Sequence, residues 1–196
     1  MPAAERRELI LGAARDEFGK RGYYGATTDQ IAKAAGISQP YVVRMFGTKE
    51  KLFLEVIHDA LDTLMVAFRE AHADALARGA TGKDLQMSVG GAFIDLVTTK
   101  GLHTVLLQAF VSGSDPAIGA AAREGFLEIY RFLRDEVHFP LDAVEGFLGS
   151  GMLFSVLLGI QMPSVYSTDS DAAELMEASF GEKCRVILDT MVENTD

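Results

Sequence analysis

Apolar residues recur at spacings of three and four along almost the whole chain, and this period predicts helices. Near the N-terminus, residues 5–22 place Ile10, Ala14 and Phe18 on one face, which is typical of an amphipathic helix. The same period returns in later segments, and no segment alternates apolar and polar residues as a half-buried strand does. The pattern therefore predicts an all-α protein of about nine helices.

Capping residues and glycines divide the next part of the chain into two short helices. Thr27 is followed three residues later by Gln30, the spacing of a capping box. Gly36 suits the left-handed conformation that ends a helix. Ser38 is predicted to cap a third helix, whose first turn tolerates Pro40 because its N–H groups have no intrahelical partners.

Longer helices are predicted over the rest of the chain. Thr48 is expected to cap a helix that runs to about residue 78. Glycine- and proline-containing breaks then delimit further helices at residues 85–99, 103–111, 116–139, 141–162 and 172–192.

The second and third helices, joined by a turn that contains Gly36, form the helix-turn-helix arrangement. Ile31, Ala35, Ile37, Val42 and Phe46 are its predicted buried residues. The opposite face of the third helix then presents a set of polar and aromatic side chains, Gln39, Tyr41 and Arg44.

These three side chains suit the reading of DNA. Glutamine can bond adenine with two hydrogen bonds, and arginine can bond O6 and N7 of guanine in the same way. Lys49 lies at the start of the fourth helix, where a cation and free N–H groups both favour a phosphate.

Charge is divided unevenly along the chain. Residues 1–56 carry nine Lys or Arg against seven Asp or Glu, whereas residues 57–196 carry nine against twenty-one. A polyanionic partner would therefore be contacted by the first quarter of the chain. The acidic remainder is expected to be a solvated surface.

The segment TTDQIAKAAGISQPYVVRMFGTKEKLFLEV resembles the N-terminal domain of the TetR-type, or tetracycline-repressor-like, regulators. The shared features are Thr-Thr, Ile-Ala, Ala-Gly-Ile-Ser, an aromatic residue before a phenylalanine, and Thr-Lys-Glu-x-Leu. The resemblance implies a helix-turn-helix DNA-binding domain at residues 1–47 and a helical ligand-binding and dimerisation domain at residues 48–196. It implies DNA contacts for Thr27, Thr28, Ser38, Gln39, Pro40, Tyr41, Arg44 and Lys49.

Two positions depart from the family pattern. Val43 stands where relatives usually have tyrosine, and Met45 where they have histidine or tyrosine. Tyr41 could supply a phenol from a neighbouring position; otherwise the chain binds its operator less tightly than its relatives do.

The resemblance also implies a homodimer formed through the last two helices. Residues 146–162 are uncharged and rich in glycine, and helix-interior glycines, each costing about 1 kcal/mol relative to alanine, indicate close packing of helices. A membrane span is the rival interpretation, but the segment is only marginally long and ends at Pro163. We expect no membrane insertion.

A small-molecule effector is the further partner that the resemblance implies. An acidic part with many aromatic residues favours a hydrophobic or cationic molecule. The candidate pocket residues are Phe93, Val97, His103, Gln108, Phe126, Tyr130 and Phe154. For each of them, a place in an ordinary core, or for His103 and Gln108 a bond to a neighbouring backbone carbonyl, is the competing interpretation.

Catalytic and metal motifs are weak. Gly149-Ser150-Gly151 lacks the context of a nucleophile elbow, residues 79–84 lack the spacing of a P-loop, and His58 and Asp62 would make only half a metal site. No enzymatic activity, cofactor or metal is therefore predicted.

The lone Cys184 and the absence of an apolar leader pattern at the N-terminus favour the cytoplasm. The sequence thus predicts a ligand-responsive transcriptional repressor that binds double-stranded operator DNA. The alternative is an all-α small-molecule-binding protein or enzyme whose helix-turn-helix is only structural.

Overall fold

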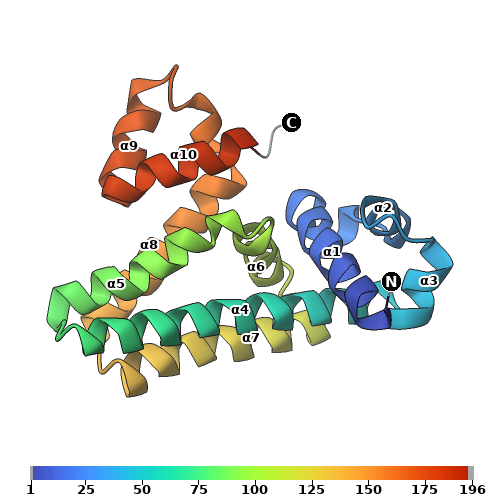
Figure 1. The fold of residues 1–196 in the computed structure, drawn as a ribbon, viewed down its shortest axis with the longest axis horizontal. Coiled ribbons are helices and arrows are strands. Elements are labelled where there is room, and N and C mark those ends of the chain that lie inside the picture. The colour runs from blue at the N-terminus through green and yellow to red at the C-terminus, as the bar shows by residue number, and fades with distance from the viewer. Residues whose placement is uncertain (1, 194–196) are drawn as a thin grey trace. The chain divides into compact units, whose positions relative to one another are not determined.

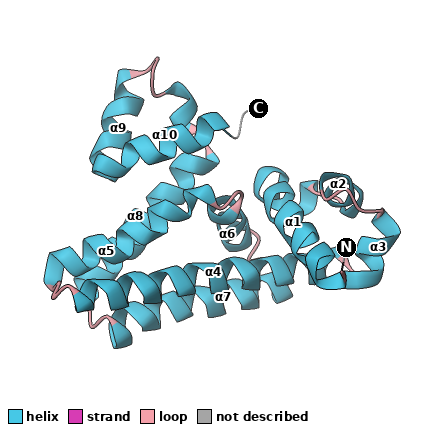
Figure 2. Cartoon of the chain, viewed as in Figure 1, coloured by secondary structure: helices cyan, strands magenta, loops and turns pink. Residues whose placement is uncertain are grey.

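The computed structural model describes residues 2–193, with side chains described as far as Thr190. Within that range every regular element is a helix, and no strand is present (Figure 2). The all-α fold class is therefore confirmed. The ten α-helices are α1 (Ala3–Gly25), α2 (Thr28–Ala34), α3 (Gln39–Phe46), α4 (Lys49–Ala77), α5 (Gly82–Asp95), α6 (Leu102–Val111), α7 (Pro116–Arg131), α8 (Leu141–Gly159), α9 (Ser170–Phe180) and α10 (Cys184–Glu193).

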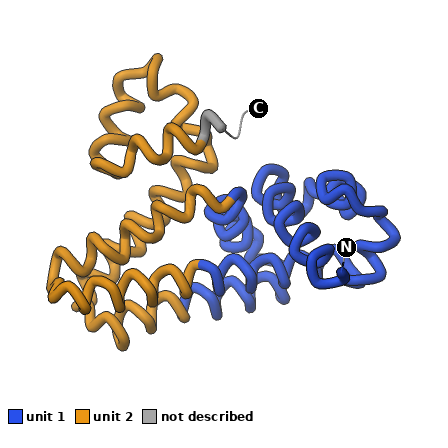
Figure 3. Tube along the Cα trace, viewed as in Figure 1, with its two compact units in different colours: residues 1–63, 100–127 blue, residues 64–99, 128–196 orange. Residues whose placement is uncertain are grey.

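The chain divides into two compact units (Figure 3). The first unit comprises the described residues up to Thr63 together with Lys100–Leu127, and the second comprises Leu64–Thr99 with the described residues from Glu128 onward. Both α4 and α7 begin in the first unit and end in the second. The predicted functional boundary at residues 47 and 48 remains a prediction.

In the first unit, α1, α2 and α3 follow one another around a small core (Figure 1). The predicted apolar face of α1 is buried, with Ile10, Ala14 and Phe18 fully inaccessible to solvent. The ring of Phe18 meets the ring of Phe53, on α4, at a centroid distance of 4.7 Å. This contact attaches the first turns of α4 to α1.

Helix α6 packs against α1 at unusually short range in the same unit. A Cβ atom added to Gly101 would lie 2.7 Å from the carbonyl oxygen of Arg15, and one added to Gly19 would lie 2.3 Å from Oγ1 of Thr104. Gly101 also has a φ of 78°, a conformation that L side chains rarely adopt. The two helices therefore meet at these glycines, and at Gly101 the backbone of α1 leaves no room for a side chain.

The second unit has its own apolar core, formed by residues of α8, α9, α10 and the 3₁₀ turn Leu96–Thr98. The buried members of this core are Val97, Phe154, Leu157, Leu158, Met176, Phe180, Cys184 and Ile187. Cys184 is thus a buried free thiol, and this burial raises its pKa. It packs as a small apolar residue.

Two predicted helices differ from those observed. The single helix expected at residues 172–192 is two helices, α9 and α10, because Gly181 takes a φ of 51° and a 3₁₀ turn follows it. The helix expected to run from Pro116 to Phe139 changes at Phe132–Glu136 into a π-helix, a widened turn that local periodicity does not reveal.

Candidate nucleic-acid interface

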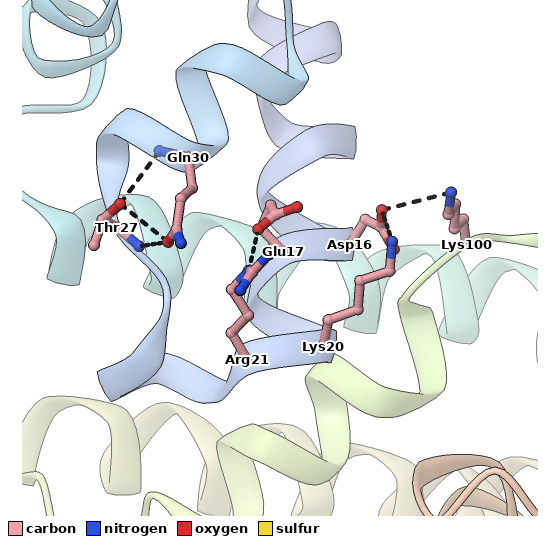
Figure 4. A network of polar contacts seen from close by, with 7 residues as sticks. All are labelled: Asp16, Glu17, Lys20, Arg21, Thr27, Gln30 and Lys100. Carbon is pink, nitrogen blue, oxygen red and sulfur yellow. Dashed lines mark hydrogen bonds and ion pairs between the residues drawn. The ribbon is translucent and has the colours of Figure 1, made fainter.

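The N-terminus of α2 is formed by the capping box predicted from the sequence. The backbone N–H of Gln30 donates to Oγ1 of Thr27 at 3.2 Å, and the backbone N–H of Thr27 donates to Oε1 of Gln30 at 2.9 Å (Figure 4). Gly36, with a φ of 64°, ends the α2 segment as predicted. These local interactions fix the relative orientation of α2 and of the turn that leads to α3.

The start of α3 differs in one respect from the prediction. Ser38 occupies the N-cap position, but its hydroxyl makes no capping hydrogen bond. Its carbonyl accepts from the N–H groups of Tyr41 and Val42 at 3.0 and 3.3 Å. The exposed Ser38 hydroxyl is therefore not engaged in capping the helix.

One face of the α2–α3 pair is anchored in the core. Ile31, Val42 and Phe46 are buried, as the sequence predicts, and Ala32 is buried beside them. Ala35 and Ile37, also expected in the core, are only half-buried because they belong to the turn at the edge of the domain. The anchored side chains fix which side of α3 faces away from the core.

The opposite face of α3 carries the predicted polar and aromatic side chains. Arg44 is exposed, while Gln39 and Tyr41 are half-buried. Nε2 of Gln39 donates to Oγ1 of Thr28 at 3.3 Å, which joins the start of α3 to the start of α2. Thr28 of α2 thus lies beside Gln39 of α3. Tyr41 and Arg44 follow on the same helix as Gln39.

Lys49 is held at the start of α4 by two contacts. Its Nζ donates to the carbonyl oxygen of Ala26 at 3.2 Å and lies 4.8 Å from the centroid of the Tyr23 ring. Burial raises the pKa of Tyr23, and the negative charge of Glu50 adds to this effect. The phenol therefore stays neutral, and its ring face is available to the Lys49 ammonium group.

The two positions that depart from the family pattern lie on α3. Val43 is 39% exposed and Met45 is half-buried. An apolar side chain therefore faces solvent at position 43.

Arg6 and Tyr23 were missed by sequence reasoning. Arg6, near the start of α1, has its guanidinium carbon 4.9 Å from the centroid of the Tyr41 ring, and Tyr23 supports Lys49. Neither contact has a local sequence signal, because each joins residues more than twenty positions apart.

The candidate effector-pocket residues lie in both units. In the second unit Val97 and Phe154 belong to the buried core, and Phe93 packs against it with its ring 5.5 Å from that of Phe154. The guanidinium carbon of Arg134 lies over the ring of Tyr130, 5.0 Å from the ring centroid.

The remaining three candidates lie in the first unit. His103 is 3% exposed, and this burial lowers its pKa to about 3. Phe126 packs edge-on against Phe110 at 5.5 Å. Oε1 of Gln108 would lie 2.9 Å from a Cβ atom at Gly22, so Gln108 faces the kink of α1.

The geometry of α1, α2 and α3 defines a helix-turn-helix domain. Residues 10–56 match the family model described as bacterial regulatory proteins, tetR family. The chain is 39% identical over 71 residues to the HTH-type transcriptional activator FasR of Mycolicibacterium smegmatis and 36% identical over 75 residues to the HTH-type transcriptional regulator RutR of Escherichia coli. The matches cover 36% and 37% of this chain but only 32% and 35% of those relatives.

Solved structures extend the likeness to the whole fold. The crystal structure of a "putative TetR-family transcriptional regulator" from Mesorhizobium loti superposes on this chain with a TM-score of 0.53 at 21% identity, and the match covers 96% of this chain and 97% of that one. The resemblance predicted from the sequence is therefore confirmed: the N-terminal domain is a tetR-family helix-turn-helix domain, and the whole chain has the fold of such regulators.

Proposed function

We propose that this protein is a DNA-binding transcriptional regulator that inserts α3 into the major groove. The observation that carries the proposal is the outward face of α3, where Gln39, Tyr41 and Arg44 lie opposite the buried Val42 and Phe46. Glutamine and arginine read adenine and guanine edges through paired hydrogen bonds. Thr27, Thr28, Ser38, Pro40 and Lys49 complete the proposed contact set, at the ends of the same helices.

We propose that the protein acts as a homodimer through the last two predicted helices, which the structure resolves as α8 and the α9–α10 pair. Support comes from the α8 stripe, which we define as Gly146, Gly149, Leu153 and Val156 of α8 together with its C-cap residue, Ile160. All five are exposed, and they recur at spacings of three and four, as in helices that pack on a partner. A Cβ atom at Gly146 or Gly149 would meet nothing within 4 Å, so these glycines serve no close packing within the chain.

We propose that the α8 stripe packs against a second copy of this chain rather than against a lipid bilayer. Among residues 2–193, α8 is the single helix whose length and composition suit a membrane span, with a mean hydropathy of 1.5. One such helix is weak evidence for a membrane span, and the charged residues Asp142 and Glu145 lie in the first turns of α8. Two copies would place two α3 helices about 34–36 Å apart, one for each half-site.

We propose that a small effector releases the protein from its operator in the cytoplasm, so that the protein is a repressor. The support is the close contact between α6 and α1 at Gly101 and Gly19, through which we expect a displacement of α6 to be transmitted to α1. An effector that binds the α6 region would shift the population toward dimers whose α3 helices no longer fit the operator. His103 and Gln108 lie on α6, and with Phe126 they are the proposed effector contacts of the first unit, which suit a hydrophobic or cationic molecule. Phe93, Val97, Tyr130 and Phe154 are the proposed contacts of the second unit.

The Arg44→Ala variant tests DNA recognition. We expect operator affinity to fall by about 1–3 kcal/mol, because a paired arginine–guanine contact is lost. Fluorescence anisotropy with the duplex upstream of the protein's own gene measures the loss, and circular dichroism checks the fold. Arg131→Ala removes the same charge from an exposed position of α7 and should bind as the parent does.

The same assay separates a regulator from a structural helix-turn-helix. A parent chain without salt-dependent affinity for any duplex at low salt would sink the proposal, as would equal binding by Arg44→Ala and the parent. Deleting the gene should raise expression of a reporter driven by its operator; a fall instead would indicate activation, as the name of FasR states for that relative.

A further inference from the structure

Two arginines from different helices share the ring of Tyr41. The guanidinium carbon of Arg6, on α1, lies 4.9 Å from the ring centroid, and that of Arg44, on α3, lies 4.8 Å from it. Both distances are within the range of cation–π contacts. Tyr41 therefore joins the start of α1 to the proposed DNA-reading face of α3.

Arg6 differs from the other basic residues of α1 in having no acidic partner among the described residues. Each of the others forms an ion pair with a carboxylate, two of which appear in Figure 4. The pairs are Arg7 with Glu55, Arg15 with Asp59, Lys20 with Asp16, and Arg21 with Glu17.

The helix around Arg6 provides no carboxylate to neutralise it. Residues three and four positions away on a helix are neighbours of a side chain, and here they are Pro2, Ala3, Leu9 and Ile10. Nε of Arg6 is buried and has no hydrogen-bond acceptor among the described residues, whereas the side chain as a whole is half-buried. Packing on Tyr41, rather than an ion pair, therefore holds the guanidinium.

Arg6 and Arg44 together make a local concentration of positive charge. Because both guanidinium carbons lie so near one centroid, they are at most 9.7 Å apart, close to the screening length of about 8 Å at physiological ionic strength. Arg44 also has no ion pair among the described side chains. An anion placed beside Tyr41 would be attracted by both cations at once.

From this arrangement we infer that Arg6 is a DNA-phosphate-binding residue, held on the reading surface by the ring of Tyr41. The planar guanidinium can stack on an aromatic ring and still offer its terminal N–H groups to a phosphate. If α3 enters the major groove as proposed, Arg6, beside Tyr41, would lie near the flanking DNA backbone. This inference rests on the proposed DNA-binding function.

The test is the salt dependence of DNA affinity for the Arg6→Ala variant. Fluorescence anisotropy measures this affinity between about 50 and 200 mM salt. The two labelled probes are the duplex upstream of the protein's own gene and a random-sequence duplex. Loss of one phosphate contact should lower affinity for both duplexes by about fivefold to tenfold near 0.1 M salt and reduce the slope of log K against log salt by about 0.9. Arg6→Lys keeps the charge and should keep the slope. Arg131→Ala is the matched charge control.

A double-substitution cycle tests the role of the ring. In a Tyr41→Leu background, Arg6→Ala should lower affinity by much less than in the parent, because the guanidinium is then no longer positioned. Circular dichroism confirms the fold of each variant, and Arg6→Gln replaces Arg6→Ala if the latter does not fold.

The outcomes separate this inference from the proposed function. If the parent chain binds no duplex, the proposed function fails, and the role of Arg6 fails with it. If the parent binds and Arg44→Ala weakens binding, while Arg6→Ala matches Arg131→Ala in affinity and slope, only the role of Arg6 is overturned.

Discussion

His103 is a single imidazole in an otherwise apolar part of α6, and its burial has a measurable consequence. Removal from water disfavours the charged form, which lowers the pKa of His103 from its ordinary 6.5 to about 3. Between these two values the unfolded chain binds a proton at this position and the folded chain does not. The free energy of unfolding must therefore fall as the pH falls below about 6.5.

The expected size of this effect is about 1.4 kcal/mol for each pH unit between those values. We expect the parent protein to lose about 1.5–2 kcal/mol more than His103→Leu when the pH is lowered from about 6.5 to 5. Urea unfolding of both proteins at several pH values measures the difference. Parallel stability curves would show that His103 is not a buried neutral imidazole.

At the scale of single residues, sequence patterns found the polar face of α3 but not its supports. Gln39, Tyr41 and Arg44 follow from helical periodicity once Val42 and Phe46 are taken as buried. The contacts of Arg6 with Tyr41 and of Lys49 with Tyr23 do not follow, because they depend on how α1 and α4 pack against the helix-turn-helix.

At the scale of elements, the contact between α1 and α6 depends on glycine. Gly101 has a positive φ, and a Cβ atom added to it would lie 2.7 Å from a backbone oxygen, which cannot rotate away as a side-chain end can. In contrast, a Cβ atom at Gly12 of α1 would meet nothing within 4 Å. The two positions make a matched pair of glycine-to-alanine substitutions.

We expect Gly101→Ala to lower the free energy of unfolding by about 1–3 kcal/mol, through backbone strain and overpacking. Gly12→Ala should raise it by about 0.4–1 kcal/mol, because alanine restricts the unfolded chain without a clash. Denaturant midpoints at constant m-value measure both changes. A neutral Gly101→Ala would mean that α6 and α1 can separate without cost.

Helix ends were predictable where a local signal exists. The capping box at Thr27 and the left-handed Gly36 act through residues within a few positions of each other, so the sequence contains the whole interaction. The break between α9 and α10 and the π-helix at Phe132–Glu136 were missed. In the second case the ring of Phe132 stacks on Phe68 at 5.9 Å, a contact between distant parts of the chain.

At the scale of the whole molecule, the proposed dimer makes a prediction about assembly. The α8 stripe exposes Leu153 at 42% and Ile160 at 61%, and transfer of such surface from water is the main favourable term in association. We expect the 21.2 kDa chain to sediment as a dimer and Leu153→Arg to sediment as a monomer with weaker operator binding.

Leu76→Arg is the control for that experiment, because Leu76 is 54% exposed on α4, outside the α8 stripe. This variant should remain dimeric. A monomeric parent chain at micromolar concentration, or a Leu153→Arg variant that still dimerises, would contradict the proposed interface.

The sequence by itself determined the helical class, most helix ends and the two faces of α3, because periodicity and capping act over a few neighbouring residues. Only the tertiary structure decided which side chains support that face and at which glycine the backbone of another helix leaves no room for a side chain. Arg6 contacts Tyr41, and Gly101 packs against the backbone of Arg15, although the members of each pair are far apart in the sequence. Such contacts follow from the packing of whole helices, which local patterns do not specify.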